Sequence, residues 1–217
     1  MAPPDGLGLR ERKKLETRQR IQQVAIDLFG ERGFDDVTVT EVARAANVSQ
    51  ATVFNYFPTK EDLVLHGMAA YGDRLVDTLR DHPGGVPMLQ TFRAEILEPR
   101  GVLAQNDPSA IDGLVRVHEI IAGSPALRAR QLLIAEATAA DVAELFAGGA
   151  PDAVHPRFLA AAVVGITQAM TSEIHRLAAA GHSGTDIAEI VLPQGARAVD
   201  LLIAGLAAED ANTRSGR

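Results

Sequence analysis

The stretch between Thr38 and Lys60 constrains this chain most, because it predicts two short helices joined by a tight turn. Three hydroxyl residues in it are each followed three positions later by a residue that can complete a helix cap: Thr38 with Glu41, Ser49 with Thr52, and Thr59 with Asp62. The hydroxyl oxygen of such a pair accepts a hydrogen bond from an unsatisfied backbone N–H at the start of a helix. These caps predict helices over residues 39–46, 50–57 and from 60 onward, and Pro58 ends the middle helix.

The residues between the first two helices, 46–48, are too few for anything except a sharp turn. Asn47 is the residue in this turn that best tolerates the left-handed backbone conformation. Seven apolar residues are expected to form a small shared core: Val42, Ala43, Ala46, Val48, Val53, Phe54 and Phe57. The opposite face of the second helix is polar and uncharged, and consists of Gln50, Ala51, Thr52, Asn55 and Tyr56. A short helix of this kind fits a DNA major groove as the recognition helix of a helix-turn-helix.

The segment from Thr17 to Val64 resembles the N-terminal domain of TetR-family transcriptional regulators. The resemblance rests on Gly33-Phe34, Thr38-Val39, Ala43, Val48-Ser49, Phe54, Tyr56-Phe57 and Lys60. Asn47 stands where the family usually has glycine, a difference that the tolerance of asparagine for the left-handed region accommodates. A shorter segment, residues 53–64, is also similar to mycofactocin-associated TetR regulators, which implies a response to acyl-CoA.

The resemblance implies base contacts from Gln50, Thr52 and Asn55, and phosphate contacts from Tyr56 and Lys60. The predicted DNA-binding set is completed by Arg18, Thr38, Thr40, Ser49 and Ala51. The recognition helix contains no arginine or lysine, so it cannot make the common bidentate contact to guanine. Amide side chains favour adenine and the threonine methyl group favours thymine, which predicts a preference for A·T pairs.

The net charge of −7 argues at first against a nucleic-acid partner, but the charges are unevenly distributed. Residues 1–60 hold nine basic and eight acidic side chains, whereas residues 61–217 hold twelve basic and twenty acidic ones. The basic excess lies at Arg10, Arg12, Lys13, Lys14, Arg18 and Arg20. Directly before a helix-turn-helix, these residues predict an arm that contacts DNA phosphates, and a solvated terminus is the alternative.

The rest of the chain predicts an all-α fold, because no segment sustains the alternating pattern of a β-strand. Helices are expected from near Leu9 to Arg32 and over residues 60–80, 86–104, 108–122, 125–147, 156–180 and 185–207. A three-helix DNA-binding domain with its arm, residues 1–60, would precede a larger helical domain for effector binding and dimerisation, residues 61–217. The sequence has no cysteine, and its first residues lack the features of a signal peptide, so a soluble cytoplasmic protein is expected.

The last two predicted helices differ from the others. Residues 157–181 are apolar on most faces, and such a helix needs burial on two sides. In TetR-like proteins the final two helices form a four-helix bundle with a second subunit, which implies a homodimer through residues 156–208. Pro193 and Gly195 are expected to kink or interrupt the last helix.

The sequence contains none of the common catalytic or metal-binding motifs, so an enzyme is not expected and no cofactor is predicted. The six histidines lack metal-ligand spacing. A pocket for a small effector is expected among the helices before the dimer pair, lined by Phe92, Ile96, Leu114, His118, Phe158 and Met170. For His118 a hydrogen-bonded position in the core is favoured over a ligand contact. With no tryptophan and many aliphatic side chains, this pocket suits an apolar or acyl-type ligand.

The leading hypothesis is a dimeric, ligand-responsive DNA-binding regulator that represses transcription from a near-palindromic operator until an effector releases it. An activator, or a regulator controlled by a protein partner, is the alternative within the same class. From another class, the C-terminal helices could form a small-molecule carrier, or a vestigial enzyme, that bears a helix-turn-helix. The contiguous DNA-binding motif argues against the carrier, and the lack of a catalytic constellation argues against the enzyme.

Overall fold

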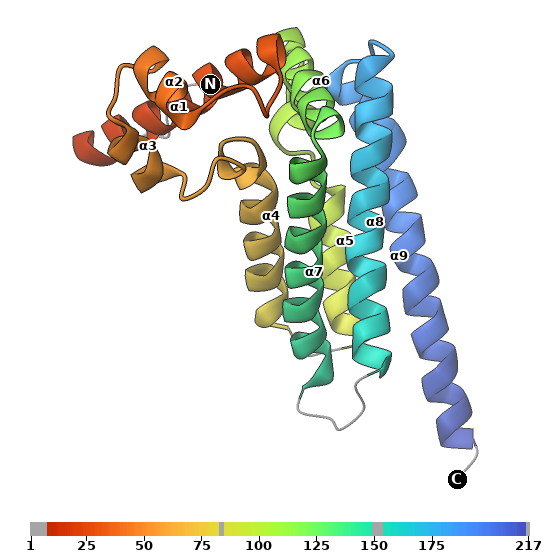
Figure 1. The fold of residues 1–217 in the computed structure, drawn as a ribbon. Helices are drawn as coiled ribbons and strands as arrows, with labels where there is room; N and C mark the ends of the chain where they lie inside the picture. The colour runs from red at the N-terminus through yellow and green to blue at the C-terminus, as the bar shows by residue number, and fades with distance from the viewer. Residues whose placement is uncertain (1–7, 83–84, 149–153, 216–217) are drawn as a thin grey trace. The chain divides into compact units, whose positions relative to one another are not determined.

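The computed structural model describes residues 8–82, 85–148 and 154–215, and every regular element in these ranges is helical (Figure 1). The elements are α1 (Leu9–Arg32), α2 (Val39–Ala45), α3 (Gln50–Tyr56), α4 (Asp62–Arg80), α5 (Val86–Leu97), the 3-10 helix η1 (Gly101–Ala104), α6 (Pro108–Gly123), α7 (Pro125–Ala147), α8 (Val154–Ala179) and α9 (Gly184–Ser215). The predicted all-α fold class is confirmed. The first seven residues and Pro83-Gly84, which follow the predicted helix over residues 60–80, lie outside the described residues.

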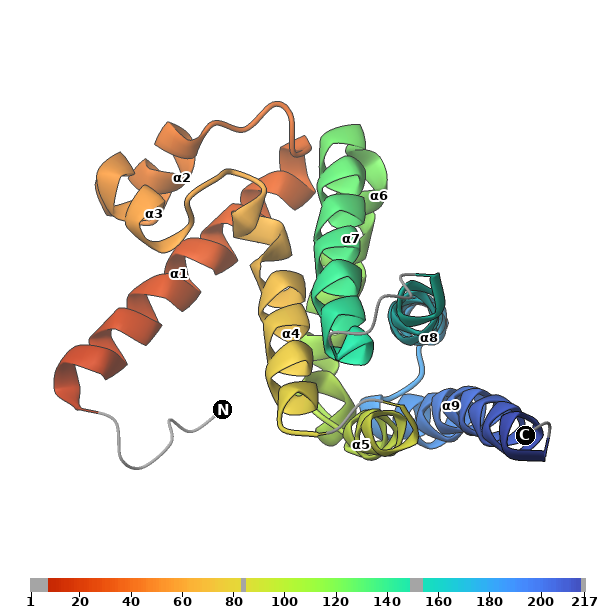
Figure 2. The same ribbon diagram turned by 90° about the horizontal axis from the view of Figure 1, so that it is seen from below.

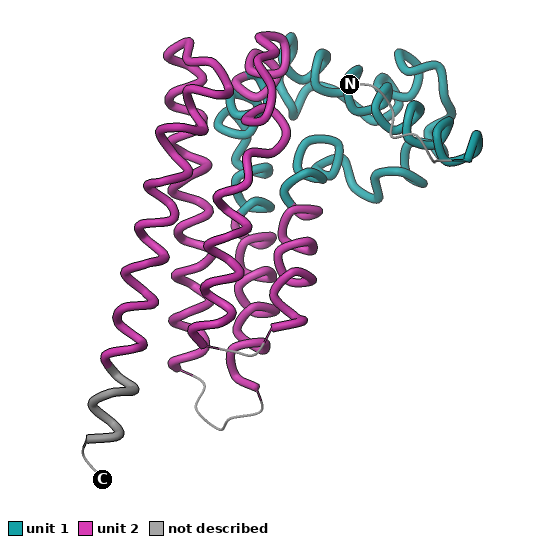
Figure 3. Tube along the Cα trace, turned by 180° about the vertical axis from the view of Figure 1, so that it is seen from behind, with its two compact units in different colours: residues 1–68, 116–131 teal, residues 69–115, 132–217 magenta. Residues whose placement is uncertain are grey.

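The chain forms two compact units (Figure 3). Unit 1 comprises residues 1–68 and 116–131, and unit 2 comprises residues 69–115 and 132–217. Helices α4, α6 and α7 each contribute residues to both units. The predicted boundary between a DNA-binding domain (residues 1–60) and an effector-binding and dimerisation domain (residues 61–217) stays a prediction.

Unit 1 is built on the end of α1. Gly33 has a positive φ of 88°, and its N–H donates to the Phe29 carbonyl at 2.8 Å, which ends the helix at Arg32 as predicted. Phe34 then folds back, and its ring centroid lies 5.0 Å from that of Phe29. Both rings are buried, so α1 braces α2, which packs against α1 and α3.

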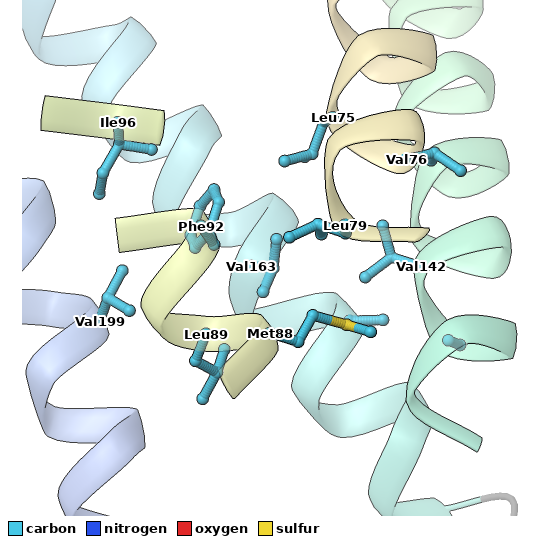
Figure 4. Close-up of a cluster of buried hydrophobic side chains, with 12 residues drawn as sticks. Leu75, Val76, Leu79, Met88, Leu89, Phe92, Ile96, Val142, Val163 and Val199 are labelled. Atoms are coloured by element: carbon cyan, nitrogen blue, oxygen red, sulfur yellow. The ribbon is translucent and has the colours of Figure 1, made fainter. Parts of the chain in front are cut away.

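Unit 2 contains a core to which five helices contribute (Figure 4). Its buried members include Leu75 and Leu79 of α4, Met88 and Phe92 of α5, Val142 of α7, Val163 of α8 and Val199 of α9. Helix α9 packs against α5, α8 and η1, and Figure 2 shows it beside α5. Phe92 and Leu79 are fully buried, so aliphatic and aromatic side chains fill this part of unit 2.

The predicted helix over residues 86–104 is wrong after Leu97. Glu98 adopts an extended conformation, with φ −80° and ψ 113°. It precedes Pro99, whose ring disfavours the helical conformation of the residue before it. Arg100 is also extended, and the chain resumes as η1 at Gly101.

Pro193 and Gly195 do not interrupt the last helix, because α9 runs through both residues, and the alternative expectation of a kink there stays a prediction. A proline inside a helix removes one backbone hydrogen bond. Burial of Val191, Leu192 and Val199 on the packed side of α9 offsets this loss.

Gly67 of α4 does not mark a close packing contact with another helix. It is exposed, and a Cβ atom added to it would meet no other atom within 4 Å. The close contact of α4 lies instead at Gly72, where an added Cβ would collide with the hydroxyl of Thr138. Gly72 therefore allows α4 and α7 to approach each other within unit 2.

Candidate nucleic-acid interface

The predicted capping pairs at the start of α2 and α3 are confirmed. The Thr38 N–H donates to Glu41 Oε2 at 2.8 Å, and the Glu41 N–H donates to Thr38 Oγ1 at 3.3 Å, which is a complete capping box. At the start of α3 the Thr52 N–H donates to Ser49 Oγ at 3.0 Å. These bonds define where both helices begin.

The turn between α2 and α3 has the predicted geometry. Asn47 has a φ of 54°, and it is the only non-glycine residue with a positive φ in the part of the chain that the structure describes. The N–H of Val48 donates to the Ala43 carbonyl at 2.9 Å, which satisfies a carbonyl at the end of α2. The left-handed residue thus turns the chain directly into the cap of α3.

The exposed face of α3 differs from the predicted one at Phe54. This side chain is 41% exposed, whereas helical periodicity predicted it in the core. Val53 and Phe57 are buried and fill the core beneath α3, so Phe54 is displaced to the face that also exposes Gln50, Ala51 and Asn55. The other predicted readers on α3, Thr52 and Tyr56, are half-buried.

Side-chain hydrogen bonds orient two of the predicted contact residues. Thr40 Oγ1 donates to Gln50 Oε1 at 3.4 Å, and both residues are exposed. An amide oxygen has two lone pairs, so Gln50 can still accept from an adenine N6 while its NH₂ donates to N7. The hydroxyls of Ser49 and Thr52 are 2.7 Å apart. This bond uses part of the hydrogen-bonding capacity of the Thr52 hydroxyl, and the Thr52 methyl group makes none, so it remains available for a base.

Arg18 is turned into unit 1. Its guanidinium lies within hydrogen-bond distance of the His66 ring, with 3.1 Å between Nη2 and Nδ1, and its Cζ is 5.5 Å from the centroid of the Phe57 ring. The Phe57 and His66 rings meet edge-on, 5.9 Å apart. These contacts join α1 and α4 to the residue that ends α3, so Arg18 positions the recognition helix.

Lys60 also makes an internal contact. Its Nζ donates to the Phe34 carbonyl at 2.5 Å and lies 4.2 Å from the centroid of the Phe34 ring. An ammonium group has three donors, so this bond leaves two of them for a phosphate. Thr38, Thr40, Ser49 and the exposed residues of α3 thus share one helix-turn-helix, and Arg18 and Lys60 brace it.

The Glu41 carboxylate makes the helix-turn-helix sensitive to acid. Its pKa is lowered from 4.5 to about 2, mainly by the backbone N–H of Thr38 and then by the Thr38 hydroxyl and Arg32, whose Nη1 is 2.8 Å from Oε1. The folded state therefore favours the ionised carboxylate. This contribution to stability is fully present above pH 4.5 and is lost as the pH falls through about 2.

We expect the thermal unfolding midpoint of the wild type to fall more steeply between pH 5 and pH 2.5 than that of a Glu41→Gln variant. The variant has no carboxylate to protonate at this position. Calorimetric scans of both proteins at half-unit pH steps measure the difference. Parallel pH profiles would contradict the assigned role of Glu41.

A second feature of unit 1 is a cavity of about 550 Å³ with an acidic lining. Its charged residues are Asp27, Glu31, Asp35, Asp36, Glu119 and Arg116, and Arg116 Nη1 donates to Asp27 Oδ1 at 2.8 Å. Carboxylates repel phosphates, so this cavity is not part of the nucleic-acid interface.

His118, one of the six predicted ligand residues, is exposed on the segment of α6 that belongs to unit 1, so it is not a core histidine.

The other five predicted ligand residues belong to unit 2, but they do not line one site. Phe92 and Ile96 are buried in the core described above, and Met170 packs against that core. Leu114 packs against a second apolar cluster around Leu177, Ile187 and Val191, which Met170 also contacts. Phe158 is 60% exposed at the start of α8. The structure therefore brings Phe92, Ile96 and Met170 together.

Comparison with known proteins identifies the helix-turn-helix. Residues 21–66 match the family model for bacterial regulatory proteins of the tetR family. The HTH-type transcriptional regulator TcmR of Streptomyces glaucescens is 26% identical over 176 residues, which is 78% of this chain and 78% of TcmR. MftR of Mycobacterium tuberculosis, named for mycofactocin biosynthesis, is 30% identical over 86 residues, which is 40% of this chain and 43% of MftR.

A solved structure has a similar fold. GusR of Salmonella enterica superposes with a TM-score of 0.53 at 20% identity, covering 88% of this chain and 95% of GusR. The family model spans the last part of α1, the whole helix-turn-helix and the start of α4, where the capping and turn geometry was found. Residues 21–66 are therefore a DNA-binding domain of the TetR type, and the curated relatives of the chain are transcriptional regulators.

Proposed function

We propose that the protein is a dimeric repressor that leaves its operator when a small effector binds. The observation that carries the DNA-binding part is the capped helix α3, which exposes the uncharged residues Gln50, Ala51 and Asn55 above a buried Val53. An uncharged face on a short, braced helix suits base edges, and basic residues before it supply contacts to phosphates. A cytoplasmic location is part of this proposal.

The exposed surface of α9 supports dimerisation through residues 156–208. Between residues 193 and 208 the exposed side of this helix is mainly apolar, and it consists of Pro193, Gln194, Arg197, Asp200, Leu201, Ala204, Gly205, Ala207 and Ala208. Residues 184–208 are long and apolar enough to cross a membrane, by length and composition only. Core helices of soluble proteins meet the same criterion, and a second subunit would cover this face.

Two-fold symmetry would place two α3 helices about 34–36 Å apart on successive major grooves of a near-palindromic site. Gel shifts with DNA flanking the protein's own gene test the proposed function most directly. We expect a retarded complex that is competed by the same DNA and not by a scrambled duplex.

Light scattering at micromolar concentration should give the mass of a dimer, and the mass of a monomer would contradict the proposed dimerisation.

The exposed amides of Gln50 and Asn55 support a preference for A·T pairs, since each can make a bidentate contact to adenine. Selection from random DNA should return half-sites whose strongest positions are A·T. Half-sites anchored only on guanine would contradict the assigned base contacts while leaving DNA binding itself intact.

Replacing Lys60 with alanine is expected to weaken binding to all DNA sequences alike and to lower the salt slope of binding by about one. The ammonium retains two donors beyond its bond to the Phe34 carbonyl, and one of them would neutralise a phosphate. Binding constants measured over a range of salt concentrations give the slope. An unchanged slope with a lowered unfolding midpoint would show that Lys60 acts only inside unit 1.

We infer that the effector is a small apolar or acyl-type molecule that binds within unit 2. Both apolar clusters of this unit contact Met170, and an added Cβ at Gly195 of α9 would collide with the Met170 side chain. A flexible thioether side chain between two apolar clusters can move to admit a ligand. Phe92, Ile96 and Leu114 are the other predicted contacts that these clusters support.

Effector binding is expected to act through α4, which has its first seven residues in unit 1 and the remainder in unit 2. Couplings of this kind are typically about 1–3 kcal/mol, or about 5–150-fold in affinity. Linkage supplies the test, because operator DNA must weaken effector binding by the same factor by which the effector weakens DNA binding. Equal effector affinity with and without operator, measured by calorimetry, would rule out release as the mechanism.

Within the same class, the alternatives are an activator and a regulator controlled by a protein partner. A reporter gene placed behind the selected operator distinguishes an activator from a repressor, because an activator would raise expression of the reporter and a repressor would lower it. A carrier that bears a helix-turn-helix would bind the effector without any change in DNA affinity.

A further inference from the structure

Phe54 is an exposed aromatic residue on α3 that is not among the predicted DNA contacts. Its side chain is 41% exposed and lies one helical turn after Gln50 and beside Asn55. It is not needed beneath the helix, because Val53 and Phe57 are 1% and 0% exposed and fill that core. Exposing an aromatic ring to water is unfavourable in free energy, and a contact that buries the ring against DNA would remove this penalty.

The chemistry of the major groove identifies what Phe54 could contact. Among the four bases only thymine presents a methyl group there, and apolar side chains, including phenylalanine, pack against it. Phe54 has no polar atom, so it cannot hydrogen-bond to a base edge or a phosphate. The Thr52 methyl is the competing reader, but Thr52 is half-buried, and its hydroxyl is held by Ser49 at 2.7 Å.

We propose that Phe54 determines specificity by packing against a thymine 5-methyl group in each half-site; this inference rests on the proposed DNA-binding function. Gln50 and Phe54 are four residues apart, a rise of about 6 Å along the helix. Base pairs stack about 3.4 Å apart. The thymine therefore lies one or two base pairs from the base that Gln50 reads.

The experiment uses the full-length protein and DNA in which single thymines are replaced by uracil. Uracil pairs like thymine and lacks only the 5-methyl group. An operator is first selected from random DNA with the wild type, and each thymine of a half-site is then replaced in turn. At one thymine the wild type should lose about fourfold in affinity, the effect expected for one methyl group taken out of water. The Phe54→Ala variant should lose less than about twofold at that same position.

Two further variants make the assignment specific. Thr52→Ser removes the Thr52 methyl and keeps its hydroxyl, so it should retain the full uracil effect. Phe54→Leu keeps an apolar side chain and should retain part of it. Thermal unfolding of Phe54→Ala should match the wild type within a few degrees, because the residue lies outside the core.

The proposal is overturned if no thymine shows a uracil effect, or if the effect is equal in the wild type and in Phe54→Ala. It is also overturned if Thr52→Ser abolishes the effect instead. In these cases selective DNA binding stands and only the role of Phe54 fails. If the wild type selects no sequence from random DNA, the proposed function fails as well.

Discussion

Replacing Leu201 with glutamate is expected to separate the dimer into monomers and to reduce affinity for the two-half-site operator by at least about 100-fold. Leu201 is 73% exposed on α9, in the middle of the face proposed to meet the second subunit. A carboxylate buried there without a partner would oppose association. Once the subunits separate, each recognition helix binds alone and the gain from linking two half-sites is lost.

Leu132→Glu is the matched control for this experiment. Leu132 is 67% exposed, but it lies on α7, outside the helices proposed for the dimer. This variant should remain dimeric and bind the operator like the wild type. Light scattering and gel shifts on both variants measure the two properties. A dimeric Leu201→Glu protein, or dissociation of Leu132→Glu instead, would contradict an interface on α8 and α9.

Replacing Phe57 with alanine is expected to reduce the free energy of unfolding of unit 1 by about 3–5 kcal/mol. The Phe57 ring is fully buried, lies 5.5 Å from Arg18 Cζ and meets the His66 ring edge-on. Its removal would leave a cavity where α1, α3 and α4 meet. A typical domain has only about 5–15 kcal/mol of stability, so operator binding should also be lost at temperatures where the wild type binds.

Phe54→Ala provides the comparison, since it removes the same side chain from the exposed face of the same segment. It should change the unfolding free energy by less than about 1 kcal/mol. Denaturant titrations followed by circular dichroism give both values. Similar losses for the two variants would mean that the burial of Phe57 and the exposure of Phe54 are wrongly assigned.

The local features of the DNA-binding domain could be predicted because each depends on a few consecutive residues. The Thr38–Glu41 capping box is a pair of hydrogen bonds across one helical turn, and Asn47 adopts its positive φ within a three-residue turn. Gly33 ends α1 for the same local reason. Such features are present in the sequence as spacing, and this spacing also carries the resemblance to the TetR family.

The environment of each side chain could not be predicted in the same way, because it depends on residues that are distant in the sequence. Helical periodicity allowed Phe54 in the core, but Val53 and Phe57 already fill the space beneath α3, so Phe54 faces solvent. Arg18 turns inward because His66, forty-eight residues away, lies beside it. Neither arrangement is visible as a local pattern.

The same distinction applies to unit 2. The pattern of apolar residues correctly indicated that Phe92 and Ile96 are buried, but periodicity cannot tell a packed core from the wall of a cavity. Pro193 would end an isolated helix, whereas α9 continues because α5 and α8 bury its neighbours.

By itself the sequence determined where helices begin and turn, since backbone hydrogen bonding there is local. Only the tertiary structure decided which side chains are left exposed to meet DNA, because burial depends on packing between distant segments.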